Sequence, residues 1–192
     1  MIRFDKPGET PLDDISGLIA KGVRTRADLD NAESENILLP TLKYVADSAN
    51  SRRVTIDVAF LKKLHKEMLG NVWLWAGEFR TVQTSIGVEP HKIYHDLLHL
   101  LDDLRFWEKN WDYKDTATRL HHKLVKIHPF ANGNGRWSRL ATDIWLIKNG
   151  HDLIEWGGNL ISANTHRKNY IDALKAADNG HYEPLKEFMF RD

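Results

Sequence analysis

Apolar residues recur every three or four positions along most of the chain, which is the spacing of a buried face on an α-helix. The pattern is clear after residue 90, where Leu97, Leu101 and Leu104 are separated by polar residues. Together with caps and helix breakers, it predicts about seven helices, over residues 26–48, 57–70, 91–109, 115–127, 136–148, 166–177 and 184–190. The chain is therefore predicted to be a compact all-α protein.

Several of these helix boundaries have a specific cause. Thr25 is the expected N-cap of the first helix, and Thr55 or Asp57 that of the second, because their side-chain oxygens can accept hydrogen bonds from free N–H groups. Pro40 lies inside the first helix, and proline cannot donate the backbone hydrogen bond that the helix requires there. We therefore expect a kink or a break at that residue.

One short segment has a different pattern. Residues 79–86, Phe-Arg-Thr-Val-Gln-Thr-Ser-Ile, alternate with a period of two and are rich in β-branched residues, and Gly87 follows them. These features favour an edge strand or a hairpin. The aromatic stretch 73–77, Trp-Leu-Trp-Ala-Gly, precedes the segment and is expected to form a turn.

The charge balance and the cysteine count exclude several classes of protein. The 192 residues include 27 basic and 27 acidic side chains, so the chain lacks the basic excess of a general nucleic-acid or membrane binder. There is no cysteine, which excludes disulfides, zinc–thiolate sites and cysteine nucleophiles. No apolar run reaches the ~18 residues of a membrane span, and no signal peptide is visible. We expect a cytoplasmic protein without nucleic-acid or membrane partners.

The fourth predicted helix leads into the segment with the densest chemistry. Asp115 is its expected N-cap, and Pro129 should end it, because a residue before proline is disfavoured in the α conformation. His128 therefore lies at the mouth of a helix. An imidazole with an ordinary pKa of about 6.5 is mostly neutral at pH 7, as a general base must be.

Residues 128–139 read His-Pro-Phe-Ala-Asn-Gly-Asn-Gly-Arg-Trp-Ser-Arg. Glycines before a helix N-terminus let free N–H groups approach an anion closely. Arg136 and Arg139 are three residues apart, so both lie on one helical face and can grip one polyphosphate. The alternative is a glycine-rich connection with solvated arginines and a capping histidine. Many functional residue types within twelve positions favour the phosphate site.

Other residues that could carry chemistry favour ordinary structural roles. His91 and His95 have the i, i+4 spacing of zinc ligands, but no HExxH-like arrangement completes a site, and a solvated helix start is the better interpretation. His121 and His122 are expected on a helix surface or in local pairs, and Trp137 is expected to pack rather than to border a ligand.

The segment resembles the signature of the Fic family, His-Pro-Phe-x-Asp/Glu-Gly-Asn-Gly-Arg-x-x-Arg, at every fixed position except Asn132. Residues 75–80, Trp-Ala-Gly-Glu-Phe-Arg, resemble the stretch before the family's β-hairpin flap. Residues between 10 and 37 resemble the subgroup called mobile mystery protein B. The resemblance implies a compact, all-α Fic-type domain with a short β-hairpin flap over residues 51–192, after an N-terminal extension over residues 1–50.

Fic proteins typically transfer AMP from ATP to a Ser, Thr or Tyr hydroxyl of a target protein. By this resemblance, His128 would deprotonate the target hydroxyl, and the oxygen would attack the α-phosphorus. Gly133, Asn134 and Gly135 would line the anion hole. The two arginines would hold the β- and γ-phosphates. The expected nucleotide-binding residues are Gly133, Asn134, Gly135, Arg136 and Arg139.

The resemblance also implies a docking segment and a metal. The flap would bind the target by strand addition, which recognises backbone rather than sequence. Its expected docking residues are Arg80, Thr81, Val82, Thr84 and Ile86. In the family, the residue at position 132 is a carboxylate that binds the Mg²⁺ of the nucleotide. Asn132 is neutral and a poorer ligand for a hard dication, so Mg²⁺ binding is expected to be weakened.

Many Fic proteins carry an inhibitory helix with the motif Ser/Thr-x-x-x-Glu-Gly/Asn, whose glutamate pairs with the second arginine of the signature and displaces the γ-phosphate. Glu35-Asn36 matches the end of this motif, although Asn31 occupies the Ser/Thr position. Glu35 is thus the expected regulatory residue and would contact Arg139. Glu33 is its rival, and the alternative is that both acids are solvated.

Two function classes remain open at this stage. The first is a protein adenylyltransferase, or a Fic enzyme that transfers UMP, phosphate or phosphocholine instead of AMP. The second is a catalytically weak or silent Fic-fold module that binds a nucleotide or a partner, which Asn132 alone supports. The sequence leaves the target protein unidentified. If the chain has no internal inhibitor, restraint would come from a separate regulatory partner protein.

Overall fold

The computed structural model describes residues 16–157 and 163–191. These residues fold into helices joined by short loops, which confirms the predicted all-α class. The α-helices are α1 (Arg26–Thr41), α2 (Ser48–Arg53), α3 (Val58–Leu69), α4 (Ile93–Asn110), α5 (Tyr113–Ile127), α6 (Asn134–Lys148), α7 (Ala163–Asp178) and α8 (Glu183–Met189). In this part of the chain, no helix combines the length and the apolar character that crossing a membrane requires.

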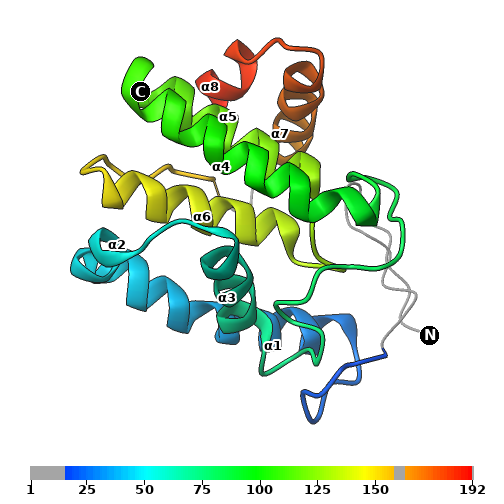
Figure 1. The fold of residues 1–192 in the computed structure, drawn as a ribbon. Coiled ribbons are helices and arrows are strands. Elements are labelled where there is room, and N and C mark those ends of the chain that lie inside the picture. Colours follow the sequence, from blue (N-terminus) through cyan, green and yellow to red (C-terminus); the bar gives the residue numbers. More distant parts are fainter. Residues whose placement is uncertain (1–15, 158–162, 192) are drawn as a thin grey trace.

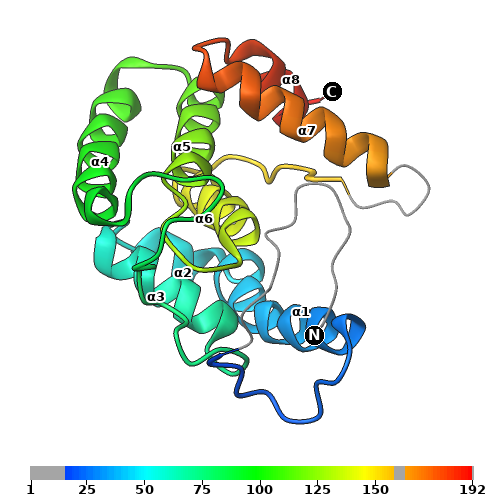
Figure 2. The ribbon, with the colours of Figure 1, turned by 90° about the vertical axis from the view of Figure 1, so that its right-hand side faces the viewer.

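The helices form two layers with α6 between them (Figure 1). The first layer contains α1, α2 and α3, and the second contains α4 and α5, with α7 and α8 packed beyond α5. Seen from the side, the loop between α5 and α6 runs toward the first layer (Figure 2). This loop, residues 128–133, is the first half of the signature segment, and the fold places it where the two layers meet.

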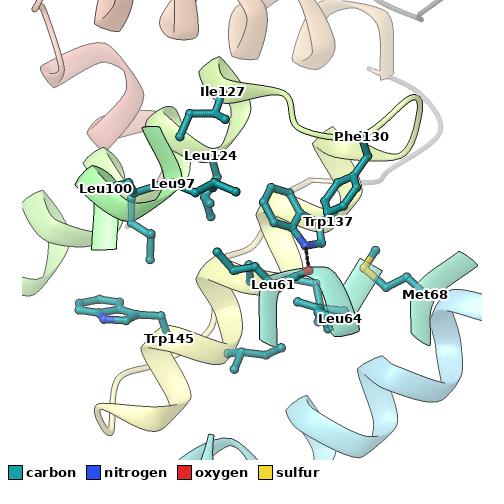
Figure 3. Packing of buried hydrophobic residues seen from close by; sticks show 14 of the residues in the cluster. Leu61, Leu64, Met68, Leu97, Leu100, Leu124, Ile127, Phe130, Trp137 and Trp145 are labelled. Carbon is teal, nitrogen blue, oxygen red and sulfur yellow. Dashed lines mark hydrogen bonds between the residues drawn. The ribbon is translucent and has the colours of Figure 1, made fainter. Parts of the chain in front are cut away.

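The core is built around Trp137 of α6, which is fully buried (Figure 3). Its indole Nε1 donates a hydrogen bond to the carbonyl oxygen of Leu61 on α3, at 3.0 Å. Phe130, from the signature loop, packs edge-on against the indole with ring centroids 5.0 Å apart. The predicted packing role of Trp137 is confirmed, and the loop is anchored in the core through an aromatic ring.

The N-terminal helix begins as predicted and ends earlier. Thr25 and Asp28 form a capping box, in which each side chain accepts a hydrogen bond from the backbone of the other residue. Pro40 lies in the last turn of α1, and the chain then forms a π-helical turn, η1 (Leu42–Ala46). The expected helix over residues 26–48 is therefore interrupted, because Pro40 lacks the N–H that would continue the normal hydrogen-bond pattern.

The α5 and α6 helices, which flank the signature loop, begin earlier than predicted. Asp112, not Asp115, caps α5, since its carboxylate accepts a hydrogen bond from the Lys114 N–H at 2.8 Å. The α6 helix begins at Asn134 rather than Arg136. Gly133 forms its N-cap with a φ of +77°, a left-handed conformation that residues other than glycine rarely adopt. The glycine-rich loop before α6 is thus shorter than the sequence indicated.

The predicted β-hairpin flap is not observed, since residues 79–89 form bends and the described ranges contain no strand. The guanidinium of Arg80 donates hydrogen bonds to the carbonyl oxygens of Val82 and Val88, so these groups serve a side chain rather than a strand ladder. An isolated antiparallel bridge joins Leu18 to Trp73. We refer to residues 79–89 as the flap segment.

The N-terminal part of the chain packs on the helical body. The α1 helix lies against α3, and Leu29 of α1 is fully buried. Residues 1–15 of the expected extension, with part of the stretch that resembles mobile mystery protein B, lie outside the described residues.

Candidate active site

His128 ends α5 in a left-handed conformation, with a φ of +51°. Pro129 follows it, as the predicted end of the helix requires. The imidazole is buried, and neither ring nitrogen makes a well-aligned hydrogen bond within the described chain, although the backbone of Val125 lies close enough to interact with the ring. Burial lowers the pKa of His128 to about 4, and the nearby positive charge of Arg80 adds to the shift. The ring is therefore neutral at pH 7 and free to accept a proton.

Arg80 fixes the backbone around this histidine. Its Nε donates to the His128 carbonyl oxygen at 2.7 Å, and its backbone N–H donates to the Pro129 carbonyl oxygen at 2.9 Å. Because the same guanidinium also binds Val82 and Val88, one buried side chain ties the flap segment to the end of α5. Arg80 was predicted to dock a target, but its guanidinium points inward.

The other predicted docking residues lie differently. Val82 and Ile86 are 72% and 52% exposed, and Thr81 is exposed as well. Thr84 is half-buried, and its hydroxyl donates to the Ile86 carbonyl oxygen. The flap segment therefore presents two exposed apolar side chains without forming a strand, and its backbone is bonded to the end of α5 through Val88 and Ile127.

The signature loop brings bare backbone to the N-terminus of α6. A Cβ atom on Gly133 would lie 2.6 Å from the Cδ1 of Leu69, so this turn has no room for a side chain. A Cβ on Gly135 would meet nothing within 4 Å, which leaves open space over the first turn of the helix. The free N–H groups of that turn can therefore receive an anion.

Asn134 stabilises the loop from inside. Its Oδ1 accepts a hydrogen bond from the Phe130 N–H at 2.9 Å, and its Nδ2 donates to the Phe130 carbonyl oxygen at 2.7 Å. The side chain is buried, so it shapes the loop, and only the backbone of Asn134 is available to line an anion site.

The first arginine of the signature is held by an acid from α1. Arg136 Nη2 lies 2.5 Å from Glu33 Oε2, and the other carboxylate oxygen of Glu33 accepts a hydrogen bond from Trp73 Nε1 at 2.6 Å. The Glu33 side chain is 0% exposed, whereas that of Arg136 is 36% exposed. Glu35, the residue expected to make such a contact, is exposed on the opposite side of α1.

The second arginine has aromatic neighbours instead. The Arg139 guanidinium lies 4.9 Å from the ring centroid of Tyr170 on α7 and 5.7 Å from that of Trp156. Its Nε is buried without a hydrogen-bond partner in the described part of the chain. The observed acid–arginine pair therefore involves Arg136, not Arg139 as predicted.

Tyr170 connects Arg139 to a buried histidine. The Tyr170 hydroxyl lies 2.8 Å from His121 Nε2, and burial lowers the pKa of His121 to about 3. His122 is also buried and contacts Asp178 of α7 at 3.1 Å. The expectation that these histidines lie on a helix surface is wrong, because α7 covers this side of α5.

The Asn132 side chain is occupied by its own loop. Its Oδ1 accepts a hydrogen bond from the Gly133 N–H at 2.7 Å. The described residues contain no group of three or more His, Cys, Asp or Glu that could hold a metal ion, and His91 and His95 are exposed. A neutral oxygen that already accepts a hydrogen bond does not by itself form a Mg²⁺ site.

The sequence analysis missed His65, a fully buried residue of α3 that contacts the signature loop. Its Nε2 lies 3.0 Å from the Asn132 carbonyl oxygen, and its Nδ1 accepts a hydrogen bond from the Gly77 N–H at 2.9 Å. Apart from its position on the apolar face of a predicted helix, the sequence carries no signal for this role. Trp73 and Tyr170 were missed for the same reason, since their partners are distant in sequence.

These features define a helical protein that places a buried, neutral histidine one loop away from a helix N-terminus that carries two arginines. Comparison with known families matches residues 55–146 to the Fic/DOC family. Residues 55–146 therefore form a Fic/DOC family domain, as the signature predicted, and the match includes His128 and both arginines.

Curated relatives and solved structures agree with this assignment. The chain is 29% identical over 154 residues to a protein adenylyltransferase Fic of Aedes aegypti and 30% identical over 155 residues to that of Drosophila melanogaster. Each alignment covers 77% of this chain and only 30% of the relative. The chain thus spans about a third of the length of these relatives.

Two solved structures share the fold. Residues 134–508 of Fic-1 from C. elegans match with a TM-score of 0.66 and 23% identity, covering 91% of this chain and 51% of that one. The BepC effector protein of Bartonella tribocorum, with bound AMPPNP, matches with a TM-score of 0.62 and 17% identity over 88% of this chain and 87% of that one. At these identities the likeness shows the fold alone.

Proposed function

We propose that this protein is a protein adenylyltransferase, which transfers AMP from ATP to a Ser, Thr or Tyr hydroxyl of a target protein. The observation that carries the proposal is the buried, neutral His128, whose ring nitrogens make no well-aligned hydrogen bond, one loop away from the free N–H groups of α6. The names of the curated relatives support the same activity. Because they are about three times longer, the activity is transferred to this chain as a proposal.

The reaction needs one base and several anion-binding groups. An imidazole nitrogen of His128 takes the proton of the target hydroxyl. The hydroxyl oxygen then forms a bond to the α-phosphorus, and the bond between the α-phosphorus and the bridging oxygen breaks, releasing pyrophosphate. The N–H groups at Asn134 and Gly135 are suited to the charge that develops on the phosphate oxygens, and the Gly133 N–H would join them only if its hydrogen bond to Asn132 Oδ1 breaks.

The two arginines are proposed to bind the β- and γ-phosphates. Both can donate in the planar, bidentate geometry that phosphates accept. Arg139 is held between aromatic rings, whereas Arg136 is paired with Glu33. ATP would therefore compete with the Glu33 carboxylate for the Arg136 guanidinium, and we propose Glu33 rather than Glu35 as the regulatory acid. A separate regulatory partner remains a prediction.

No step of the reaction is assigned to Mg²⁺. A magnesium ion that arrives with ATP would be held chiefly by the phosphates, with Asn132 as its predicted, neutral protein ligand. The target is proposed to dock on the flap segment through Thr81, Val82, Thr84 and Ile86. Two of these side chains, Val82 and Ile86, are apolar and exposed. The cysteine-free sequence supports the cytoplasm as the location.

The direct test is incubation of the chain with α-labelled ATP and a cell lysate, followed by identification of modified peptides. His128→Ala is the matched control, because it removes the proposed base without adding bulk. We expect transfer by the parent and a loss of about 10²–10⁴-fold in the variant. Equal labelling by both would overturn the assignment of the base, and labelling only from UTP or another donor would overturn the choice of ATP.

The second candidate is a catalytically weak or silent Fic-fold module. Two observations favour it, since Asn132 replaces the carboxylate expected by family resemblance and Arg136 is already paired with an acid. ATP binding without transfer, in both the parent and a Glu33→Gln variant, would support this candidate over the enzyme.

A further inference from the structure

We propose that His65 is a positioning residue for the turn at Asn132 and Gly133, which would bind the polyphosphate. The two nitrogens of its neutral imidazole hold the carbonyl of Asn132 and the N–H of Gly77. This inference rests on the proposed function, because it assigns a role to the turn that would bind the polyphosphate. His65 touches no reacting atom and would act only through the backbone of the turn.

The two hydrogen bonds fix the protons on the ring. The Gly77 N–H donates to Nδ1 at 2.9 Å, so Nδ1 must carry a lone pair rather than a hydrogen. The proton therefore lies on Nε2, which donates to the Asn132 carbonyl oxygen at 3.0 Å. A charged imidazolium would place a second hydrogen on Nδ1, facing the Gly77 N–H. Burial keeps the ring neutral and lowers the pKa of His65 to about 4.

The ring is also held in place by packing. Phe130, two residues before Asn132, stacks on the imidazole with ring centroids 3.7 Å apart and an interplanar angle of 16°. A Cβ on Gly133 would lie 3.4 Å from His65 Nε2, so the turn rests directly on the histidine. His65 therefore touches the loop on both sides of Asn132, immediately before the N–H groups that begin α6.

The contact to Gly77 extends the effect to the flap segment. Gly77 has a φ of +85° and leads into that segment, and a Cβ there would lie 2.8 Å from the Cβ of Lys66. Three residues later, Arg80 binds the carbonyl oxygen of His128. The same stretch of chain is thus bonded to the phosphate turn through His65 and to the proposed base through Arg80. This arrangement sets the distance between the base and the anion-binding groups.

Two substitutions test the hydrogen bonds of the two ring nitrogens separately. In His65→Gln, the amide nitrogen lies near the position of Nε2 and can still donate to the Asn132 carbonyl. In His65→Asn, the amide oxygen lies near the position of Nδ1 and can still accept from Gly77, but the bond to the turn is lost. Both variants replace a buried aromatic ring by an amide, so each serves as the packing control for the other.

Tripolyphosphate is the probe, because it tests the anion site without the nucleobase or the transfer step. By titration calorimetry on the full chain, we expect His65→Asn to weaken tripolyphosphate binding about 5–10-fold, as the loss of one hydrogen bond implies. His65→Gln should remain within about twofold of the parent. Thermal unfolding curves of all three proteins show whether each is folded at the assay temperature.

The proposal is overturned if both variants bind tripolyphosphate as the parent does, or if both are weakened equally. If the asparagine variant does not fold, ¹⁵N spectra of the parent decide, since they must show a protonated Nε2 and an unprotonated Nδ1, and the opposite tautomer excludes the proposal. A different result would reject the adenylyltransferase function but not the role of His65. In that case the parent transfers no AMP, but His65→Gln and His65→Asn still differ in tripolyphosphate affinity. AMP transfer that is equal in all three proteins would reject the role of His65 alone.

Discussion

Glu33 and Arg136 are 103 residues apart in sequence and form an ion pair of 2.5 Å, in which the acid is completely buried and the arginine belongs to the signature segment. The carboxylate is fixed from its other side by the indole N–H of Trp73. This contact occupies one of the two guanidinium groups proposed to bind the polyphosphate. If the polyphosphate binds as proposed, the structure is in a state in which an acid of α1 occupies part of its site.

Glu33→Gln should raise both ATP affinity and the rate of AMP transfer. The amide oxygen can still accept from Trp73, so the substitution removes mainly the charge that competes for Arg136. Hydrogen bonds to charged groups contribute about 1.5–3 kcal/mol, so the gain in affinity should be about tenfold or more. Titration calorimetry with ATP measures it.

Glu35→Gln is the matched control, because Glu35 lies on the same helix and is exposed. It should change neither quantity. If Glu35→Gln activates the protein and Glu33→Gln does not, the restraint operates through a different conformation from the one described here.

The acid limb of the pH–rate profile should lie near pH 4. A base works only when it is deprotonated, and burial lowers the pKa of His128 from 6.5 to about 4, so the rate should rise with pH through about 4 and be level near pH 6. Transfer rates at saturating ATP between pH 4 and 8 check this. A midpoint near 6.5 would mean that the imidazole is solvated in the working enzyme.

Stability must be followed in the same experiment. A histidine whose pKa is depressed in the folded state favours folding above its unfolded pKa of 6.5, and this contribution is lost as the pH falls toward the folded value of about 4. His65 has the same shift. The free energy of unfolding should therefore fall below pH 6.5, and rates are comparable only where the protein remains folded.

Arg139→Ala should weaken ATP binding more than AMP binding, since AMP lacks the distal phosphates that this arginine is proposed to hold. A loss of about tenfold or more is expected for ATP, and little change for AMP. Arg105→Ala provides the control, because Arg105 is exposed and pairs only with Asp102 of its own helix among the described residues. Equal losses for both nucleotides would place Arg139 near the α-phosphate or the nucleobase instead.

Asn132→Asp should strengthen the dependence of ATP binding on Mg²⁺. An aspartate oxygen can still accept the hydrogen bond from the Gly133 N–H, and it adds the negative charge that a hard dication prefers. The measurement is ATP affinity as a function of Mg²⁺ concentration in the parent and the variant. Identical curves would show that position 132 does not contact the metal.

The sequence predicted those parts of the protein that depend on local interactions. Thr25 caps α1 as predicted, Asp57 is the one of the two expected caps that begins α3, and α3 ends at the C-cap Gly70, the last residue of the predicted range. Each of these residues acts on backbone groups a few positions away, so its role is visible in the chain itself. The signature loop was also found, because the residues proposed to function there are contiguous.

The errors arose where a partner comes from elsewhere in the chain. Residues 79–86 have a strand-like pattern, but the buried guanidinium of Arg80 binds the carbonyls that a strand would use. Glu33 was ranked below Glu35 because only folding reveals which acid faces Trp73 and Arg136. His65 was overlooked because nothing near it in sequence indicates that two distant turns meet at its ring.

The left-handed backbone of His128 has a consequence for how this position tolerates change. A residue with a side chain at a φ of +51° carries a conformational cost of roughly 1–2 kcal/mol, which glycine does not incur. His128→Gly should therefore be more stable than His128→Ala by about 1 kcal/mol, although both lack the base. Random variation screened for thermal resistance alone would tend to replace this histidine, whereas a screen for transfer would retain it. At position 128, thermal stability and the proposed transfer activity therefore favour different amino acids.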